Sequence, residues 1–342
     1  MLSIVFDDAY VRHRQQFGHP ECPERLLSIK ARLEAEGLFE NVLKPVEATR
    51  EQLEAVHDHD YLTRLKEASE GYLDPDTYIR EETYSIATLA AGGAIVAADH
   101  LWEKKRPVLA LLRPPGHHSG RDHCGGFCYL NNIAIAAQYL VDEKKAKKIA
   151  IVDIDVHHGN GTQNIFYERS DILFISTHLW GIYPGTGRTV EVGRGEGKGY
   201  NVNIPLNFNA GNKTYQGAMD EIILPILAKY RPEAILVSYG LDGHQADPLG
   251  GLDLTSDYLV EVVKQIHASA KEHCKGRLGL YLEGGYNLAA ISEVVAGTAA
   301  YFKGTALKSA LEFTEGNEEC EDRDVLDRAR DAQKDLWGLK KK

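Results

Sequence analysis

Lys148-Ile-Ala-Ile-Val-Asp-Ile-Asp-Val-His-His-Gly-Asn-Gly-Thr162 is the stretch of sequence that decides the fold. Its apolar start, residues 148–152, is typical of a buried strand, and polar residues follow where that strand ends. Asp155 and His157 are two positions apart, so on an extended backbone their side chains lie on the same face. A carboxylate and an imidazole on one face can bind a divalent ion. Because open α/β sheets bind ligands at the carboxyl ends of their strands, the stretch predicts a metal site there.

Three further apolar runs also end in polar residues. Residues 108–112 precede Arg113-Pro-Pro-Gly-His-His118, residues 234–239 precede Asp242, and residues 278–282 precede Glu283-Gly-Gly-Tyr286. A lone Asp-x-His or a tandem histidine pair is more often an ordinary loop feature. Four polar strand ends in one chain favour a shared site, because parallel neighbouring strands bring their carboxyl ends to one edge.

Strand-like runs alternate with helical patterns along the chain. The apolar runs lie at 2–6, 108–112, 149–154, 172–176, 200–204, 234–239 and 278–282, and the helical patterns at 24–36, 82–103, 131–143, 213–230, 255–274 and 288–302. This alternation predicts the α/β class, with a mainly parallel sheet and helices on both faces. We find no Pro/Ser/Gly linker and no fixed-period repeat in the 342 residues, so we expect a single domain.

Composition narrows the range of partners and compartments. The net charge of -11, from 39 basic and 50 acidic residues, argues against direct nucleic-acid binding. No apolar run approaches the ~20 residues that a membrane span needs, so we expect no membrane association. The start of the chain does not resemble a signal peptide. An odd number of cysteines without a framework spacing predicts reduced thiols and a cytoplasmic protein; they are Cys22, Cys124, Cys128, Cys274 and Cys320.

A series of segments resembles the zinc-dependent histone deacetylase family of the arginase/deacetylase superfamily, with features of its class II and prokaryotic members. In chain order they are His19–Arg25, Arg113–His118, Gly126–Asn132, Asp153–Thr162, Pro184–Gly187, Asp242 with Asp247-Pro248, and Glu283–Asn287. The resemblance runs from about residue 3 to about residue 303. It implies the arginase/deacetylase fold with about eight strands, a catalytic domain over 1–305, and a charged helical extension over 306–342 that is packed on or trails this domain.

The resemblance also implies the metal and the catalytic groups. One catalytic Zn²⁺ would be bound by Asp155, His157 and Asp242, and the catalytic residues would be His117, His118, Tyr286, Asp153 and Asn160. His118 would act as general base and then as general acid, with His117 as its electrostatic partner. Asp153 would stand behind His117 and raise its pKa, whereas the neutral Asn160 would leave His118 freer to titrate. Tyr286 would donate a hydrogen bond to the substrate carbonyl.

Further residues match the family's substrate channel and its other sites. The substrate-binding residues would be Gly126, Phe127, Tyr183, Leu249 and Gly284, with the two aromatic rings as channel walls. Two K⁺ sites would be formed by Asp153, Asp155, His157, Ser176 and Thr177, and by Phe166, Arg169, Ile172 and Tyr200. Arg25 would border an exit channel for acetate, although a structural ion pair explains it equally well.

These matches predict a hydrolase that removes acetyl groups from Nε-acetyl-lysine of proteins or peptides by metal-activated water. The alternatives are an acetylpolyamine amidohydrolase, or a deacylase of other short acyl amides. Leu249 stands where some polyamine enzymes have a Glu, which favours acyl-lysine, but Asp74 or Asp76 at the rim could reverse this preference. A two-manganese arginase is disfavoured because Gly159 and Gly240 replace carboxylates, and a non-catalytic reader because the ligands are intact. The expected partner is an acetylated lysine peptide, protein or small amine, and a homo-oligomer is possible.

Overall fold

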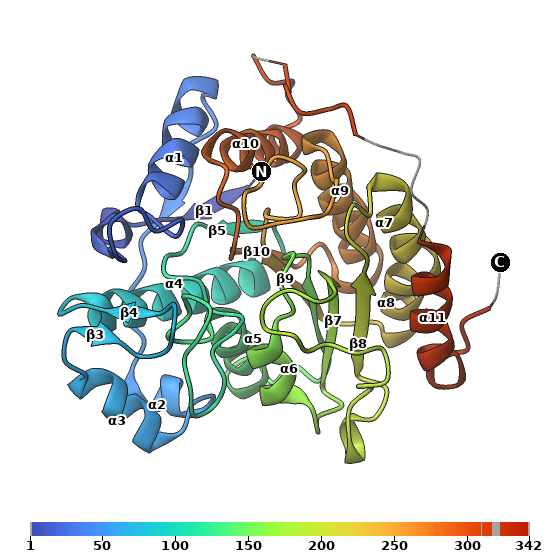
Figure 1. Ribbon diagram of the computed structural model, residues 1–342, viewed down its shortest axis with the longest axis horizontal. Coiled ribbons are helices and arrows are strands. Elements are labelled where there is room, and N and C mark those ends of the chain that lie inside the picture. Colours follow the sequence, from blue (N-terminus) through green and yellow to red (C-terminus); the bar gives the residue numbers. More distant parts are fainter. Residues whose placement is uncertain (1, 309, 317–321, 341–342) are drawn as a thin grey trace.

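An eight-stranded parallel sheet forms the centre of the protein, in a computed structural model that describes residues 2–308, 310–316 and 322–340. The strand order is β2-β1-β5-β10-β9-β6-β7-β8 (Figure 1). The strands are β1 (Ser3–Val5), β2 (Val42–Leu43), β5 (Val108–Ala110), β6 (Ile149–Asp153), β7 (Ile172–Leu179), β8 (Asn201–Leu206), β9 (Ala234–Tyr239) and β10 (Leu278–Leu282). The predicted α/β class and eight-stranded parallel sheet are confirmed.

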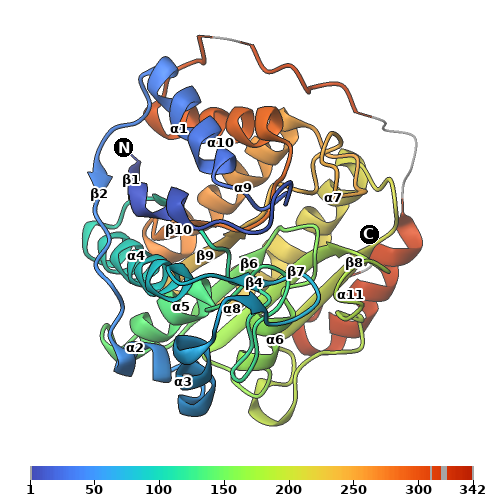
Figure 2. The ribbon, with the colours of Figure 1, turned by 60° about the vertical axis from the view of Figure 1, so that its left-hand side comes forward.

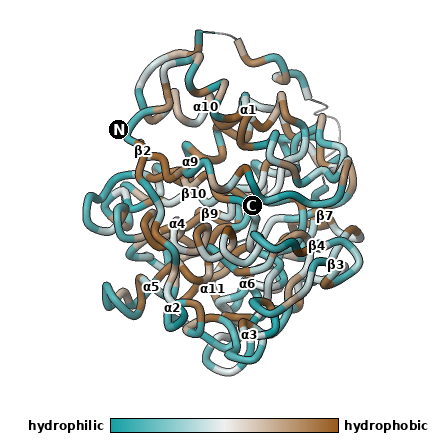
Figure 3. Tube along the Cα trace, turned by 90° about the vertical axis from the view of Figure 1, so that its left-hand side faces the viewer, coloured by the Kyte–Doolittle hydropathy of each residue, from teal (hydrophilic) through white to brown (hydrophobic). Residues whose placement is uncertain are grey.

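Helices cover both faces of this sheet, because its strands are apolar on both sides and need cover on each. α4 (Thr83–Lys104) and α5 (Asn132–Asp142) pack together on one face, with α6 (Asn160–Phe166) beside them. On the other face lie α1 (Glu24–Glu36), α10 (Leu288–Lys303), α9 (Ser256–Cys274), α7 (Asn212–Ala218) and α8 (Leu224–Tyr230) (Figure 2). Hydrophobic residues gather in α4 and in the strands (Figure 3).

Several elements are too short for the sequence analysis to have identified them. They are β2, the hairpin of β3 (Gly71–Tyr72) and β4 (Tyr78–Ile79), the helices α2 (Arg50–Glu54), α3 (His59–Glu67) and α6, and the 3₁₀ turns at Asp8–Arg12 and Gly195–Gly197. The helix expected over 213–230 is interrupted by a π-helical turn, Met219–Ile223. Two-residue strands carry no periodicity, so their pairing is decided by the neighbours they meet.

The expectation that no segment is apolar enough to span a membrane needs correction. α4 is long and apolar enough by length and composition, but 67% of its most apolar window is buried inside the protein. It lies so close to its neighbours that a Cβ at Gly92 would meet the Val46 carbonyl oxygen at 1.6 Å. The apolar character of α4 therefore reflects its place in the core of this fold.

The C-terminal helix α11 (Arg323–Trp337) packs against β8, the last strand of the sheet. The Gln333 side chain donates to the Asn201 carbonyl at 2.8 Å, and the Trp337 indole donates to the Gly199 carbonyl at 2.7 Å. Figure 1 shows the helix alongside this edge of the molecule. Among the described residues Cys22, Cys124, Cys128 and Cys274 are free thiols, as predicted, and Cys320 lies outside the described residues.

Candidate active site

Asp155, His157 and Asp242 meet beyond the carboxyl ends of β6 and β9, which are neighbours in the sheet. One possible ligand atom from each lies within 4.8 Å of the others. His157 Nδ1 is 3.1 Å from an Asp155 carboxylate oxygen and 3.2 Å from Asp242 Oδ2. Both carboxylates are fully buried. The structure thus brings together the three predicted metal ligands, one of which is distant in sequence from the other two.

Backbone amides and missing Cβ atoms shape this cluster. Gly284 N donates to Asp155 Oδ2 and Val156 N donates to Asp242 Oδ1, each at 2.8 Å. A Cβ at Gly284 would stand 2.0 Å from Asp242 Oδ2, and one at Gly240 would stand 2.1 Å from Asp155 Oδ2. Gly284, predicted to bind substrate, therefore lies against the metal ligands and makes room for them.

The donor set fits a divalent cation. Asp242 Oδ2 is buried, lies 3.2 Å from His157 Nδ1 and accepts no well-aligned hydrogen bond from the residues that the structure describes. Two buried carboxylates side by side repel each other, and a buried carboxylate oxygen without a well-placed donor costs free energy. A cation bound by two carboxylates and one imidazole removes both penalties, and this ligand set is suitable for zinc with a coordination position left open.

The histidine pair stands next to the cluster, with ring centroids 4.0 Å apart. His117 Nδ1 lies 3.0 Å from Asp153 Oδ2, and His118 Nδ1 lies 2.8 Å from Asn160 Oδ1. Because an amide oxygen only accepts, His118 donates through Nδ1, and its Nε2 is left to accept a proton. Both pairings are those that the resemblance implied.

The two imidazoles have opposite pKa shifts. Burial alone would lower the pKa of His117, but the charges of Asp155 and Asp153 outweigh it and raise this pKa to about 10. For His118 burial lowers the pKa well below its usual value, and the positive charges of His117 and His157 lower it further. Before any cation binds, His117 is therefore protonated and His118 neutral.

Tyr286 closes the site from the end of β10. Gly285 has φ +116°, which a side chain would strain, so the Gly-Gly pair permits the turn that presents the phenol. Asp247 Oδ2 accepts from the Tyr286 amide at 2.6 Å and so holds this turn. Burial raises the pKa of Tyr286 well above 10, although the charge of Arg25 opposes the shift. The hydroxyl therefore remains a hydrogen-bond donor at physiological pH.

A cavity of about 260 Å³ leads to these groups. It is lined by Asp76, His118, Gly126, Phe127, His157, Ile182, Tyr183, Leu249 and Tyr286. Phe127 has φ +69°, a conformation that a bulky residue rarely adopts, and its amide donates to Thr77 Oγ1 at 3.1 Å. The Tyr183 ring lies 4.9 Å from the His118 ring. Four of the five predicted substrate-binding residues therefore line one cavity together with His118.

Sequence reasoning gave no role to two carboxylates around this site, Glu283 and Asp247, and named a third, Asp76, only as a rim residue that could favour a polyamine. Glu283 is buried, and its Oε2 accepts from the amides of Gly116 and His117 at 2.7 and 3.2 Å. Burial raises the pKa of Glu283 to about 7. Asp247 holds the Tyr286 turn, and Asp76 lines the cavity. Both Glu283 and Asp247 lie within the quoted motifs, but nothing local in the sequence indicates which amides they accept from.

The residues of the two predicted K⁺ sites lie along β6, β7 and the adjoining loops. Asp153 and Ser176 are paired in register between these strands, and the Ser176 hydroxyl is 2.9 Å from His178 Nδ1. Phe166 ends α6, Ile172 begins β7, and the Arg169 side chain binds Asp171 at 2.6 Å. Occupation of either site by K⁺ stays a prediction.

Arg25 is fully buried beneath the Tyr286 turn. Its guanidinium donates to the carbonyl oxygens of Gly285 at 2.7 Å and Glu283 at 2.5 Å, and it lies 4.9 Å from the Tyr286 ring centroid. A third contact, 3.2 Å long, joins it to Glu21. These bonds attach α1 to the Tyr286 turn, and the exit-channel role stays a prediction.

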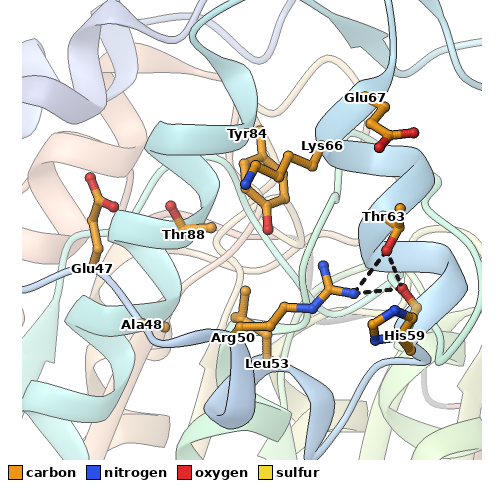
Figure 4. A pocket seen from close by; sticks show the side chains of 10 residues that line it. All are labelled: Glu47, Ala48, Arg50, Leu53, His59, Thr63, Lys66, Glu67, Tyr84 and Thr88. Atoms are coloured by element: carbon orange, nitrogen blue, oxygen red, sulfur yellow. Dashed lines mark hydrogen bonds between the residues drawn. The ribbon is translucent and has the colours of Figure 1, made fainter.

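A second pocket, of about 410 Å³, lies at the surface between α2, α3 and α4 (Figure 4). Its central cation, Arg50, donates to Glu54 at 2.6 Å, to the His59 carbonyl at 2.7 Å and to Thr63 at 3.0 Å. These bonds hold α2 against α3. The Arg50 guanidinium thus holds the two helices together. The metal-ligand cluster lies elsewhere, at the cavity lined by Phe127 and Tyr183.

Comparisons with known proteins agree with this geometry. The histone deacetylase domain model matches residues 19–302. A probable deacetylase of Archaeoglobus fulgidus is 43% identical over 295 residues, covering 84% of this chain and 82% of that protein. A histone deacetylase-like amidohydrolase of Pseudomonas aeruginosa is 38% identical over 277 residues, covering 79% of this chain and 73% of that protein.

A solved structure extends the likeness to the whole fold. The crystal structure of the HDA15 HD domain superposes with a TM-score of 0.88 at 32% identity, covering 98% of this chain and 97% of that one. The family match spans most of the chain and includes every residue of the metal cluster, the histidine pair and the Tyr286 turn. The chain therefore belongs to the histone deacetylase domain family of hydrolases that act on amide bonds.

Proposed function

We propose that this protein is a zinc-dependent amidohydrolase that removes the acetyl group from Nε-acetyl-lysine in proteins or peptides. The observation that carries the proposal is the convergence of Asp155, His157 and Asp242 with His118 and Tyr286 at one end of an aromatic-walled cavity. A zinc ion held by these three ligands would supply a Lewis acid for the acetyl carbonyl and for the attacking water.

The chain's own residues perform the proton transfers. Neutral His118, oriented by Asn160, takes a proton from the attacking water at Nε2 and later gives it to the departing amine nitrogen. His117, held against Asp153, places a second imidazole beside the reaction centre. The Tyr286 hydroxyl donates to the carbonyl oxygen as negative charge develops there.

The cavity walls favour a lysine side chain. Phe127 and Tyr183 present aromatic surface to an aliphatic stem, which gains burial between them. Leu249 at the same cavity adds an apolar contact and no charge. The Gly126 carbonyl, next to Phe127, could accept the substrate's amide proton. Together these groups suit an uncharged acyl-amine on a methylene chain.

One observation supports the second candidate, an acetylpolyamine amidohydrolase. Asp76 lines the cavity, and burial together with the charge of Asp74 raises the pKa of Asp76 to about 6. A distal ammonium of a polyamine could pair with this carboxylate at neutral pH. A peptide amide could also donate to it, so Asp76 by its chemistry suits both substrates.

The test is hydrolysis by the zinc-loaded protein of an acetyl-lysine peptide beside acetylputrescine and acetylspermidine, with an EDTA-treated control. We expect cleavage that requires metal and favours the peptide. If the protein prefers the acetylpolyamines, the proposed hydrolysis mechanism stands, but the substrate is a polyamine and not acetyl-lysine. Cleavage that survives complete metal removal would contradict the proposal.

A further inference from the structure

The loop over residues 180–191, between β7 and β8, carries Tyr183 and is held from beneath by buried polar side chains. Ile182 and Tyr183 line the cavity from this loop. At its start the Trp180 amide donates to the Leu206 carbonyl of β8 at 2.8 Å, and farther along the loop buried side chains below it make the contacts that hold it. Four lie there: His158, Gln163, His178 and Asn203, all of them buried.

Gln163, in α6, is the centre of this group. Its Oε1 accepts from Asn201 Nδ2 at 2.9 Å and from Asn203 Nδ2 at 2.8 Å, and lies 3.0 Å from His158 Nε2. Its Nε2 donates to the Glu191 carboxylate at 2.8 Å, at the far end of the loop. Because the amide nitrogen is used in this way, the amide orientation is set, and His158 Nε2 must be a donor.

His158 connects Gln163 to the loop through its two ring nitrogens. With Nε2 donating to Gln163, Nδ1 accepts from the Thr186 hydroxyl, 2.7 Å away. Asn203 adds a bond from Nδ2 to the Arg188 carbonyl at 3.3 Å. His158 directly follows His157, so the same short segment supplies a metal ligand and an anchor for the channel wall.

Glycine at position 187 permits the close approach. Its φ is +90°, and a Cβ there would stand 2.4 Å from His178 Nε2 and 2.7 Å from the His158 ring. His178 Nε2 is 3.0 Å from the Gly187 carbonyl oxygen. The loop therefore lies directly on the two imidazoles, with no room for adjustment toward them.

We propose that Gln163 and His158 are positioning residues that set where Tyr183 stands, and so determine the width of the cavity around the substrate's methylene chain. The substrate-binding part of this inference rests on the proposed acyl-lysine hydrolysis. The positioning part rests on the hydrogen bonds alone. Loss of one anchor lets Tyr183 move away from Phe127 while the metal ligands and His118 keep their own contacts.

The first test uses Thr186→Val, which keeps the side-chain shape and removes the hydroxyl bonded to His158. We expect KM for an acetyl-lysine peptide to rise about fivefold to tenfold and kcat to stay within about twofold. Thr189→Val, on the same loop without a hydroxyl contact to these residues, is the matched control and should leave KM unchanged. Unchanged KM in Thr186→Val would overturn the inference.

The second test needs no catalysis. Gln163→Glu keeps the acceptor toward Asn201 and Asn203 but sets a carboxylate against Glu191. We expect amide hydrogen exchange over 182–191 to become at least about tenfold faster in Gln163→Glu and in Thr186→Val, with exchange in β6 unchanged. Equal exchange in wild type and Thr186→Val would refute the positioning role. If the wild type cleaves no acyl-lysine peptide, the proposed function fails, and exchange still decides whether the loop is anchored in this way.

Discussion

The two imidazoles of the histidine pair differ because their surroundings differ. The charges of Asp155 and Asp153 raise the pKa of His117, whereas burial and the charges of His117 and His157 lower the pKa of His118, so two adjacent residues of one type have opposite charge states. Tyr286 is a donor because it is buried, which keeps its proton on the ring oxygen. At this scale the role of each side chain depends on the atoms that it contacts. Single-residue substitutions that remove one such contact therefore test the role of that residue.

Removal of the general base or of the carbonyl donor should stop turnover without unfolding the protein. His118→Ala and Tyr286→Phe should each lower kcat by at least about 100-fold, because each removes an interaction made with the reacting atoms. Steady-state kinetics on an acetyl-lysine peptide, with circular dichroism to verify folding, measures this. Near-wild-type turnover in either variant would refute the role of that residue.

Removal of a metal ligand should lower the amount of zinc that the protein retains. Asp242→Ala leaves one carboxylate and one imidazole, too few for a tightly bound catalytic zinc ion. After dialysis, elemental analysis should find the wild type loaded and Asp242→Ala empty. Asp220→Ala, at the exposed residue of the otherwise buried π-helical turn, is the control and should retain the ion. A fully loaded Asp242→Ala protein would exclude Asp242 as a ligand.

At the scale of elements, α11 covers the one long edge strand of the sheet. An exposed parallel edge strand such as β8 offers unpaired backbone groups to other chains. The Trp337 ring lies against Tyr200 and Tyr230, with centroids 5.7 and 6.2 Å apart. Arg323 and Arg330 reach Glu221 at 2.6 and 3.3 Å, which ties the helix to its neighbour. α11 thus packs against the edge of the same sheet.

Trp337→Ala should destabilise the protein through this contact. We expect the free energy of unfolding to fall by about 2 kcal/mol, less than for a fully buried Trp because the side chain is half-buried. Chemical denaturation measures the change, and Asp335→Ala on the exposed side of α11 should change it little. Equal stability of Trp337→Ala and wild type would mean that the packing of the Trp337 ring contributes nothing to the stability of the fold.

At the scale of the whole molecule, buried neutral histidines tie distant segments together. His57, after α2, lies 2.7 Å from the Gly120 carbonyl oxygen through Nδ1 and accepts from the Asn131 amide at 2.9 Å through Nε2. It thereby links the α2–α3 region to the loop that carries the histidine pair. Burial lowers the pKa of His57 to about 4.

This shift makes stability depend on pH. An unfolded histidine titrates near 6.5 and the native one near 4, so the unfolded state binds more protons between these values. The contribution is fully present above about 6.5 and is lost as the pH falls toward 4. Between pH 7.5 and 5.0, the wild type should lose about 2 kcal/mol more than His57→Gln.

Denaturant titrations at both pH values measure this difference. His59→Gln, at an exposed histidine two positions along, is the control and should follow the wild type. Parallel pH curves for wild type and His57→Gln would show that His57 is not the titrating group.

Most strands, several helix starts and part of the candidate metal site could be predicted from the sequence alone, because the patterns that indicate them are local. Apolar runs identified seven of the eight sheet strands, and the spacing of Asp155 and His157 predicted that their side chains would lie close together, as they do, although β6 ends at Asp153 and the backbone bends after it. Asn131 and Asn287 cap α5 and α10 by accepting from amides three residues on, so those helix starts are also local features. The motifs of the resemblance supplied Asp242, His118 and Tyr286 as partners.

The tertiary structure decided what depends on register between strands. Gly284 meets Asp155 only because β10 pairs with β9 and β9 with β6. Glu283 and Asp247 accept from backbone amides that are distant in sequence, and β2 is a strand only because β1 lies beside it. The physical reason is that side-chain alternation and helix capping act over two to four residues, whereas these contacts form only after the chain has folded.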